Sequence, residues 1–229
     1  MKDIFKRKLI WALIFNFIIL GLEIVGLVLS VQRHGIKVFI FYTENSNYFA
    51  LVISLIFCIT AIIALTKNAL PPQWVHILRF IATVCLTITF IVSVFVIIPF
   101  KPSLYKYMLY QGSSLYQHIL CPLLSLSSFL FFEYQKPLSK KVIFYALIPT
   151  IIYGGTCVVL NLLRVMTGPY PFFYFYQIPW YISIPSLLGV VAISTLTAFM
   201  LYVSHTAEEK RYIKKHLTIE DNYLDKNYQ

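Results

Sequence analysis

Long, uninterrupted apolar segments most strongly limit what this chain can fold into. Six of them are expected to span a membrane, at residues 9–31, 47–65, 77–99, 115–132, 142–163 and 181–203. Each is close to the roughly 20 residues that a helix needs to cross the hydrocarbon core of a bilayer. Their apolar residues follow one another without alternation, which favours helices over strands. The sequence therefore predicts an all-α integral membrane protein, a bundle of six transmembrane helices.

The connections between these segments are short, at 9 to 17 residues, and leave no room for a separate soluble domain. Residues 1–204 are expected to form one six-span membrane domain. Residues 205–229 are rich in charged and polar residues, and we expect them to form a polar cytoplasmic tail.

The lysines and arginines are distributed unequally between the two sides of the predicted bundle. Of the 19 in the chain, the side opposite the termini carries only Arg33, Lys37, Lys101, Lys106 and Arg164. Cytoplasmic connections are enriched in positive charge, so both termini are predicted to be cytoplasmic. The net charge of +10 thus reflects topology. It does not indicate nucleic-acid binding, because no basic groove with interleaved aromatic residues is visible.

The four cysteines lie in four different predicted spans. They are Cys58, Cys85, Cys121 and Cys157, and no two of them form a CxxC pair. Cysteine is common as a small buried apolar residue, so we interpret all four as packing residues. Neither a metal nor another cofactor is expected.

Polar and small residues recur at helical spacing on four of the predicted spans. Thr43, Asn47, Ala50 and Ser54 share one face of the second span, and Ser114, His118, Cys121 and Ser125 share one face of the fourth. Cys157, Asn161 and Arg164 do so on the fifth, and Asn16, Glu23 and Ser30 on the first. Such stripes often serve only helix packing and interhelical hydrogen bonds, which remains an alternative for most of these positions.

Glu23, His118 and Arg164 carry more information than the other polar residues. A charged group near the centre of a bilayer costs roughly 2.5 to 3.5 kcal/mol and needs a partner or a wet cavity. Together with Thr43, these residues are predicted to share one cavity that leans toward the outer face. A structural ion pair between Glu23 and Arg164 is an equally good interpretation.

Thr43 and His118 also have structural interpretations. Thr43 precedes a predicted helix and can act as its N-cap, a role for which Asn45 competes. His118 lies one turn before Pro122 and can simply be an interfacial histidine bonded to a carbonyl.

Several segments resemble a known family of membrane enzymes. The stretches 41–50 (FYTENSNYFA), 117–124 (QHILCPLL) and 164–173 (RVMTGPYPFF), together with Tyr153 and Gly154, are similar to motifs of the androgen-induced membrane hydrolase family. The short connections are most similar to its six-span prokaryotic branch. The resemblance implies a multi-pass protein of a prokaryotic plasma membrane.

The resemblance also implies an activity, the hydrolysis of fatty acid esters of hydroxy fatty acids by an intramembrane threonine. By residue-to-residue match, Thr43 is the expected nucleophile and His118 the base that takes its proton. Asn47 is a candidate for binding the oxyanion or positioning His118, and Arg164 for binding a substrate carboxylate. Glu23 and Tyr170 complete the candidate substrate-binding residues.

The last connection is crowded with aromatic residues. Tyr170 belongs to this group, which usually just anchors helices at the lipid interface. The alternative is a lid, stiffened by Pro169 and Pro171, over a lipid cavity. A different class of function, a lipid-binding or small-molecule transport protein using the same polar cavity, also fits the sequence. The sequence does not define an oligomeric state.

Overall fold

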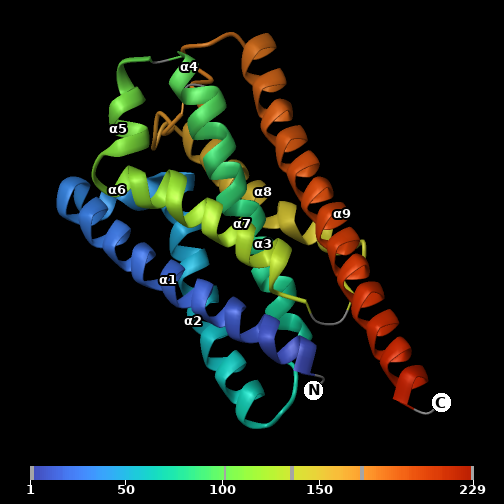
Figure 1. Ribbon diagram of the computed structural model, residues 1–229. Coiled ribbons are helices and arrows are strands. Elements are labelled where there is room, and N and C mark those ends of the chain that lie inside the picture. Colours follow the sequence, from blue (N-terminus) through green and yellow to red (C-terminus); the bar gives the residue numbers. More distant parts are fainter. Residues whose placement is uncertain (1–2, 101, 135–136, 171–172, 228–229) are drawn as a thin grey trace.

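The computed structural model describes residues 3–100, 102–134, 137–170 and 173–227, and every regular element in them is helical. Six helical segments are long and apolar enough to cross a membrane: Phe5–Ile40, Tyr42–Thr66, Gln73–Ile97, Gly112–Phe131, Val142–Leu162 and Trp180–Lys215. The predicted all-α bundle of six transmembrane helices is therefore confirmed, and the chain is a multi-pass integral membrane protein (Figure 1). Lys101, Pro171 and Phe172 lie outside the described residues.

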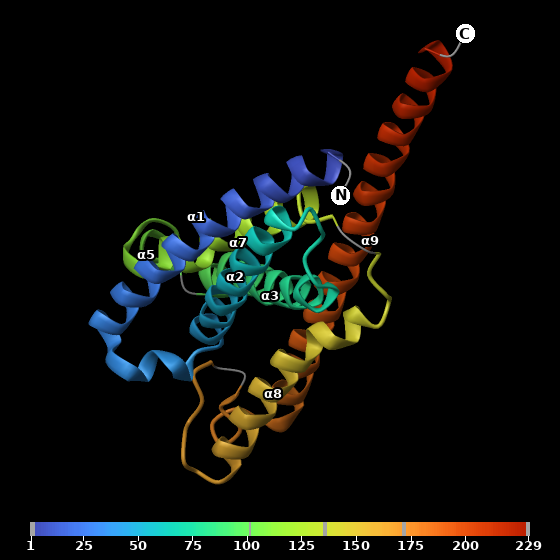
Figure 2. The same cartoon turned by 90° about the horizontal axis from the view of Figure 1, so that it is seen from below.

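The long helices are α1 (Asp3–His34), α2 (Tyr42–Thr66), α3 (Gln73–Ile91), α7 (Cys121–Phe131), α8 (Val142–Leu162) and α9 (Trp180–Asn227). Shorter elements join or extend them: η1 (Gly35–Ile40), η2 (Val92–Ile97), α4 (Ile98–Phe100), η3 (Pro102–Leu104), α5 (Tyr105–Tyr110), α6 (Gly112–Ser114) and η4 (Leu115–Leu120). The two ends of the chain lie at the same end of the bundle (Figure 1). Helix α9 projects past the other helices at its C-terminal end (Figure 2).

Helix α3 lies at the centre of the bundle and contacts α2, α7, α8 and α9. Phe80 and Phe129 occupy the core that α3 forms with α7, α8 and α9, while Phe57 fills the core between α1, α2 and α3. Ala61 and Ala82 are fully buried at these contacts, because a small side chain lets two helix backbones approach closely. Large apolar side chains cover the outside, as expected of a surface surrounded by lipid.

Two spans contain a turn of π-helix, η2 after α3 and η4 before α7. Each precedes a proline, Pro99 after η2 and Pro122 after η4. Proline has no backbone N–H, so Pro122 cannot donate to the carbonyl of His118 four residues earlier. We attribute the widened turn around His118 to this missing hydrogen bond.

The spans are longer than their apolar runs suggested. Helix α2 begins at Tyr42, five residues before the predicted start, and α9 continues without a break across residue 205 to Asn227. Phe41 occupies the N-cap position of α2, and the Asn45 amide donates to the carbonyls of Phe39 and Phe41. The capping interpretation of Thr43 is therefore wrong, because Thr43 lies inside the first turn.

Candidate functional site

Hydrogen bonds to the carbonyl oxygen of Thr43 hold the first turn of α2. The Ser46 hydroxyl and the Asn47 amide both donate to the carbonyl oxygen of Thr43, at 2.9 and 2.7 Å. Ser46 also bonds the Thr89 hydroxyl at 2.8 Å, which joins the start of α2 to α3. The amide N–H₂ of Asn47 is thus engaged with the backbone of Thr43, and its Oδ1 is buried without a partner among the described residues.

Thr43 lines a cavity of about 260 Å³. We call it the outer cavity, because the charge distribution predicts that this end of the bundle faces away from the cytoplasm. Its walls come from α2, α3, α8, α9 and the connection before α9, and they are mainly apolar, with Ile88, Val92, Val158 and Leu187 among them. It exceeds the roughly 150 Å³ of an engineered cavity that holds a benzene ring. The outer cavity is therefore large enough for part of an acyl chain.

Most hydroxyls on the wall of the outer cavity are already paired. The Tyr42 phenol bonds the Thr150 hydroxyl at 2.9 Å, and the Tyr153 phenol donates to the carbonyl of Ile40 at 2.7 Å. These bonds tie α2 and η1 to α8. Thr43 takes part in neither of these bonds and lines the same, mainly apolar space.

Tyr170 is the predicted site residue that the fold places beside Thr43. Its phenol interacts with the hydroxyl and the backbone of Thr43. Burial raises the pKa of Tyr170 to about 12, and the contact with Thr43 opposes that rise. The phenol therefore keeps its proton at neutral pH and can donate a hydrogen bond to an oxygen held next to Thr43.

His118 lies on η4 and is not among the residues that line the outer cavity. Its ring is buried, with 9% of the residue exposed, and Nδ1 has no hydrogen-bond partner among the described residues. Within the same part of the chain, no hydrogen bond joins Thr43 to His118. The fold thus brings Tyr170 and Asn47 to Thr43. His118, on η4, lies outside the lining of the outer cavity.

Glu23 and Glu44 belong to a second polar group, between α1, α2 and η4. The Glu44 carboxylate accepts hydrogen bonds from Ser30 of α1 and from Gln117 of η4, the latter at 2.6 Å. Glu23 is buried against Cys121. Gly26 permits the close approach of α1 to η4, because a Cβ there would lie 3.0 Å from the Gln117 side chain. Neither Glu23 nor Glu44 is among the residues that line the outer cavity.

Arg164 follows α8 in a left-handed backbone conformation, with φ of 59°. Its side chain is exposed, and the guanidinium lies 4.9 Å from the ring centre of Tyr176. No ion pair with Glu23 forms in the described part of the chain, so the structural pairing considered for these two residues is wrong. Asn161 holds the turn here by donating to the carbonyls of Met166 and Thr167.

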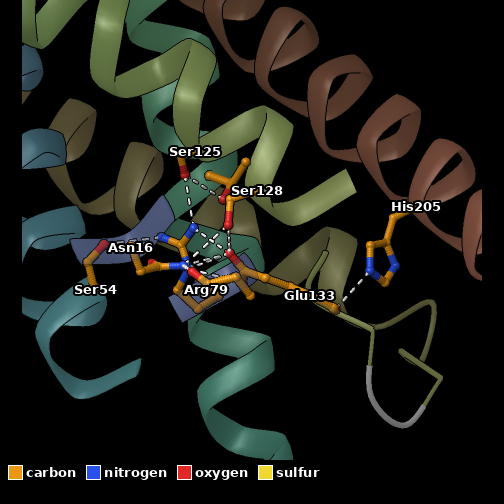
Figure 3. A network of polar contacts seen from close by, with 9 residues as sticks. Asn16, Ser54, Arg79, Ser125, Ser128, Glu133 and His205 are labelled. Atoms are coloured by element: carbon orange, nitrogen blue, oxygen red, sulfur yellow. Dashed lines mark hydrogen bonds and ion pairs between the residues drawn. The ribbon is translucent and has the colours of Figure 1, made fainter. Parts of the chain in front are cut away.

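The most extensive polar network was missed by sequence reasoning. Arg79 of α3 forms a buried ion pair with Glu133, just after α7, with Nη2 to Oε1 at 2.8 Å and both side chains fully buried (Figure 3). The same carboxylate accepts from Asn16 at 3.0 Å and from Ser128 at 2.7 Å. The charge count had assigned Arg79 to the cytoplasmic side, although residue 79 lies inside the predicted span 77–99. An arginine within a predicted span was the available signal, because a charge there needs a partner.

The ion pair joins five helices through further contacts. Arg79 also donates to Ser54 of α2 and Ser125 of α7, at 3.4 and 3.3 Å. His205 of α9 lies 3.3 Å from the carbonyl of Glu133 (Figure 3). We call the set of Asn16, Ser54, Arg79, Ser125, Ser128, Glu133 and His205 the Arg79 network. His205 is buried, so the packed part of α9 continues past residue 204.

The described residues contain no cluster of three or more His, Cys, Asp or Glu side chains that can hold a metal ion. Cys58, Cys85, Cys121 and Cys157 are all buried with free thiols. No protein-family model matches the chain, and neither a curated protein nor a solved structure is detectably similar to it.

Proposed function

We propose that this protein is an intramembrane threonine hydrolase of lipid esters in the plasma membrane of a prokaryote. The observation that carries the proposal is the place of Thr43, whose hydroxyl meets a mainly apolar cavity beside the phenol of Tyr170. An ester with a long acyl chain matches this arrangement, because the chain is apolar and its carbonyl group is polar.

The reaction would begin with attack of Thr43 Oγ1 on the ester carbonyl carbon. The oxyanion that forms accepts a hydrogen bond from the Tyr170 phenol, and the alcohol departs with a proton. Water then cleaves the acyl-threonine and releases the fatty acid. The substrate class that we propose is fatty acid esters of hydroxy fatty acids, as the family resemblance implies.

His118 is the base in this proposal. Its Nδ1 has no hydrogen-bond partner among the described residues. This supports the role, because a ring nitrogen that no other group occupies can accept a proton. Thr43 and His118 are not hydrogen-bonded in the described residues, so proton transfer requires a bridging water or a shift of η4. His118 lies in the π-helical turn η4, and single turns of this kind are frequent at functional sites.

Labelling with a fluorophosphonate probe tests the proposal, because the probe reacts with activated hydroxyls. Wild-type protein should be labelled on a peptide that contains Thr43, and Thr43→Ala should reduce labelling to background while Thr43→Ser retains it. Thr150→Val, which removes another hydroxyl of the same cavity, should leave labelling unchanged. Equal labelling of wild type and Thr43→Ala would contradict the proposal.

A second candidate, a lipid-binding or transport protein, is favoured by one observation. His118 is not among the residues that line the cavity with Thr43, and most of the cavity wall is apolar. Such a protein would bind an acyl chain without reacting. Saturable binding of a non-hydrolysable ether lipid, combined with no fluorophosphonate labelling and no ester turnover, would identify it.

A further inference from the structure

The outer cavity opens toward the membrane rather than toward water. Three of its wall residues, Ile151, Gly155 and Val191, are exposed on the outside of α8 and α9, with 55% of Ile151 and 39% of Val191 accessible. They lie within two membrane-spanning segments, where the surrounding medium is hydrocarbon.

The route from the outer aqueous side is covered by the connection before α9. Phe173 of this connection is only 2% exposed and lies 6.3 Å from the ring of Tyr153. Gly168 has φ of 103°, and a Cβ there would lie 2.6 Å from Phe173 Cβ. A glycine at this position therefore allows the connection to fold down over the cavity.

Two adjacent glycines leave the lateral side open. Gly154 and Gly155 both line the outer cavity, and a Cβ added to either would meet no atom within 4 Å. In a packed interface between helices, a glycine usually allows close backbone contact, as Gly26 does here. At Gly154 and Gly155 the space beside the backbone is instead unfilled.

We propose that the gap between α8 and α9 at Ile151, Gly155 and Val191 is a lateral portal through which the acyl chain of a bilayer lipid enters the outer cavity. We infer an acyl chain as the occupant, because the opening lies in membrane-spanning segments and is therefore bordered by the acyl chains of the bilayer. The chain then lies against Ile88 and Thr89 of α3, with its ester group toward Thr43 and Tyr170. The position of the ester group rests on the proposed function, whereas the portal itself does not.

A photoreactive lipid tests the portal without depending on catalysis. The probe is an ether-linked phospholipid with a diazirine in its chain, present in phosphatidylcholine vesicles with the purified protein. Ile88 is only 2% exposed, so crosslinking to the α3 peptide around it reports a chain inside the cavity. Wild-type protein should be crosslinked there.

Side chains that fill the gap should block this crosslink. Gly155→Leu is expected to reduce crosslinking at Ile88 about tenfold, and Val191→Trp should do the same from the opposite helix. Gly21→Leu is the matched control, because Gly21 is a lipid-exposed glycine of α1 with nothing within 4 Å of an added Cβ. It should leave the crosslink unchanged.

An unchanged Ile88 crosslink in both Gly155→Leu and Val191→Trp would overturn the portal, as would its absence in wild type. The hydrolase proposal fails separately, if Thr43 is not labelled by fluorophosphonate. If the Ile88 crosslink forms but Thr43 is not labelled, the protein binds lipid without hydrolysing it. If Thr43 is labelled but the crosslink is absent, the substrate reaches the cavity by another route.

Discussion

The Arg79 network and the outer cavity handle polar groups inside the membrane in opposite ways. In the Arg79 network, every oxygen of the Glu133 carboxylate is paired, and the guanidinium reaches two serines in addition. In the outer cavity, the Thr43 hydroxyl meets Tyr170 and a largely apolar space. The comparison indicates that the buried Arg79–Glu133 pair is a structural joint, whereas the less completely paired hydroxyl of Thr43 marks the candidate site.

The physical reason lies in the cost of burying charge. Removing ions from water costs several kcal/mol each, and only good geometry with further hydrogen bonds offsets that cost. Both oxygens of the Glu133 carboxylate are already bound by side chains of the network, so the carboxylate is not open to a ligand. Burying a hydroxyl costs less free energy than burying an ion, so the fold can place the Thr43 hydroxyl at an unfilled space.

The largest effect should come from breaking the Arg79 network. Arg79→Met leaves the Glu133 carboxylate buried without its partner, which should lower the free energy of unfolding by about 3–5 kcal/mol. The double variant Arg79→Met, Glu133→Met should recover much of the loss. Thermal unfolding in detergent measures both. A single variant as stable as wild type would show that the pair is not a structural joint.

The next largest effect concerns the proposed oxyanion donor. Tyr170→Phe should lower ester turnover about 100-fold, the usual loss for one such donor, with little change in stability. Tyr153→Phe is the control, because the Tyr153 phenol is occupied by the Ile40 carbonyl. The Tyr170 pKa of about 12 adds a pH test. Its donor function should persist at neutral pH and disappear only as pH rises through about 12.

A smaller effect is expected from removing a hydrogen bond to the buried carboxylate of Glu44. Ser30→Ala removes one of the two hydrogen bonds to buried Glu44 and should cost about 1.5 kcal/mol of stability. Ser186→Ala, at a more exposed serine bonded within its own helix, should cost less than about 0.5 kcal/mol. Urea or thermal unfolding of the two variants side by side measures the difference. Equal losses would indicate that Glu44 does not depend on Ser30.

The smallest effect concerns the proposed carboxylate contact at the rim. Arg164→Ala should reduce turnover of an ester with a free carboxylate about fivefold, a modest factor because the guanidinium is exposed. Turnover of the methylated counterpart should change little. Equal losses for the two esters would assign Arg164 to its contact with Tyr176 instead of to substrate binding.

The sequence was sufficient to predict the six-helix bundle. It was not sufficient to predict which polar residues contact one another inside the bundle. Continuous apolar runs predicted all six spans, because hydrophobic length alone decides which segments cross a bilayer. The helix ends were missed where polar residues continue a helix, as at Thr43 and His205. Hydropathy cannot distinguish a polar residue in the last turns from one in the connection.

Contacts between distant residues limited the prediction of the site. Arg79 and Glu133 are 54 positions apart, and only the packing of α3 against α7 brings them together. Arg164 was expected in a cavity because its spacing from Asn161 is helical. The chain leaves the helix at Leu162, so Arg164 turns outward. Tyr170 was a candidate by sequence, but its position beside Thr43 depends on how the last connection folds.

A crystal structure of the protein grown from a lipidic phase with a non-hydrolysable ether analogue of the ester would test the central claim most directly. The account predicts continuous acyl density in the outer cavity, ending with the polar group of the analogue between Thr43 and Tyr170. Density that ends elsewhere, or a cavity filled by side chains with Thr43 buried among them, would contradict it.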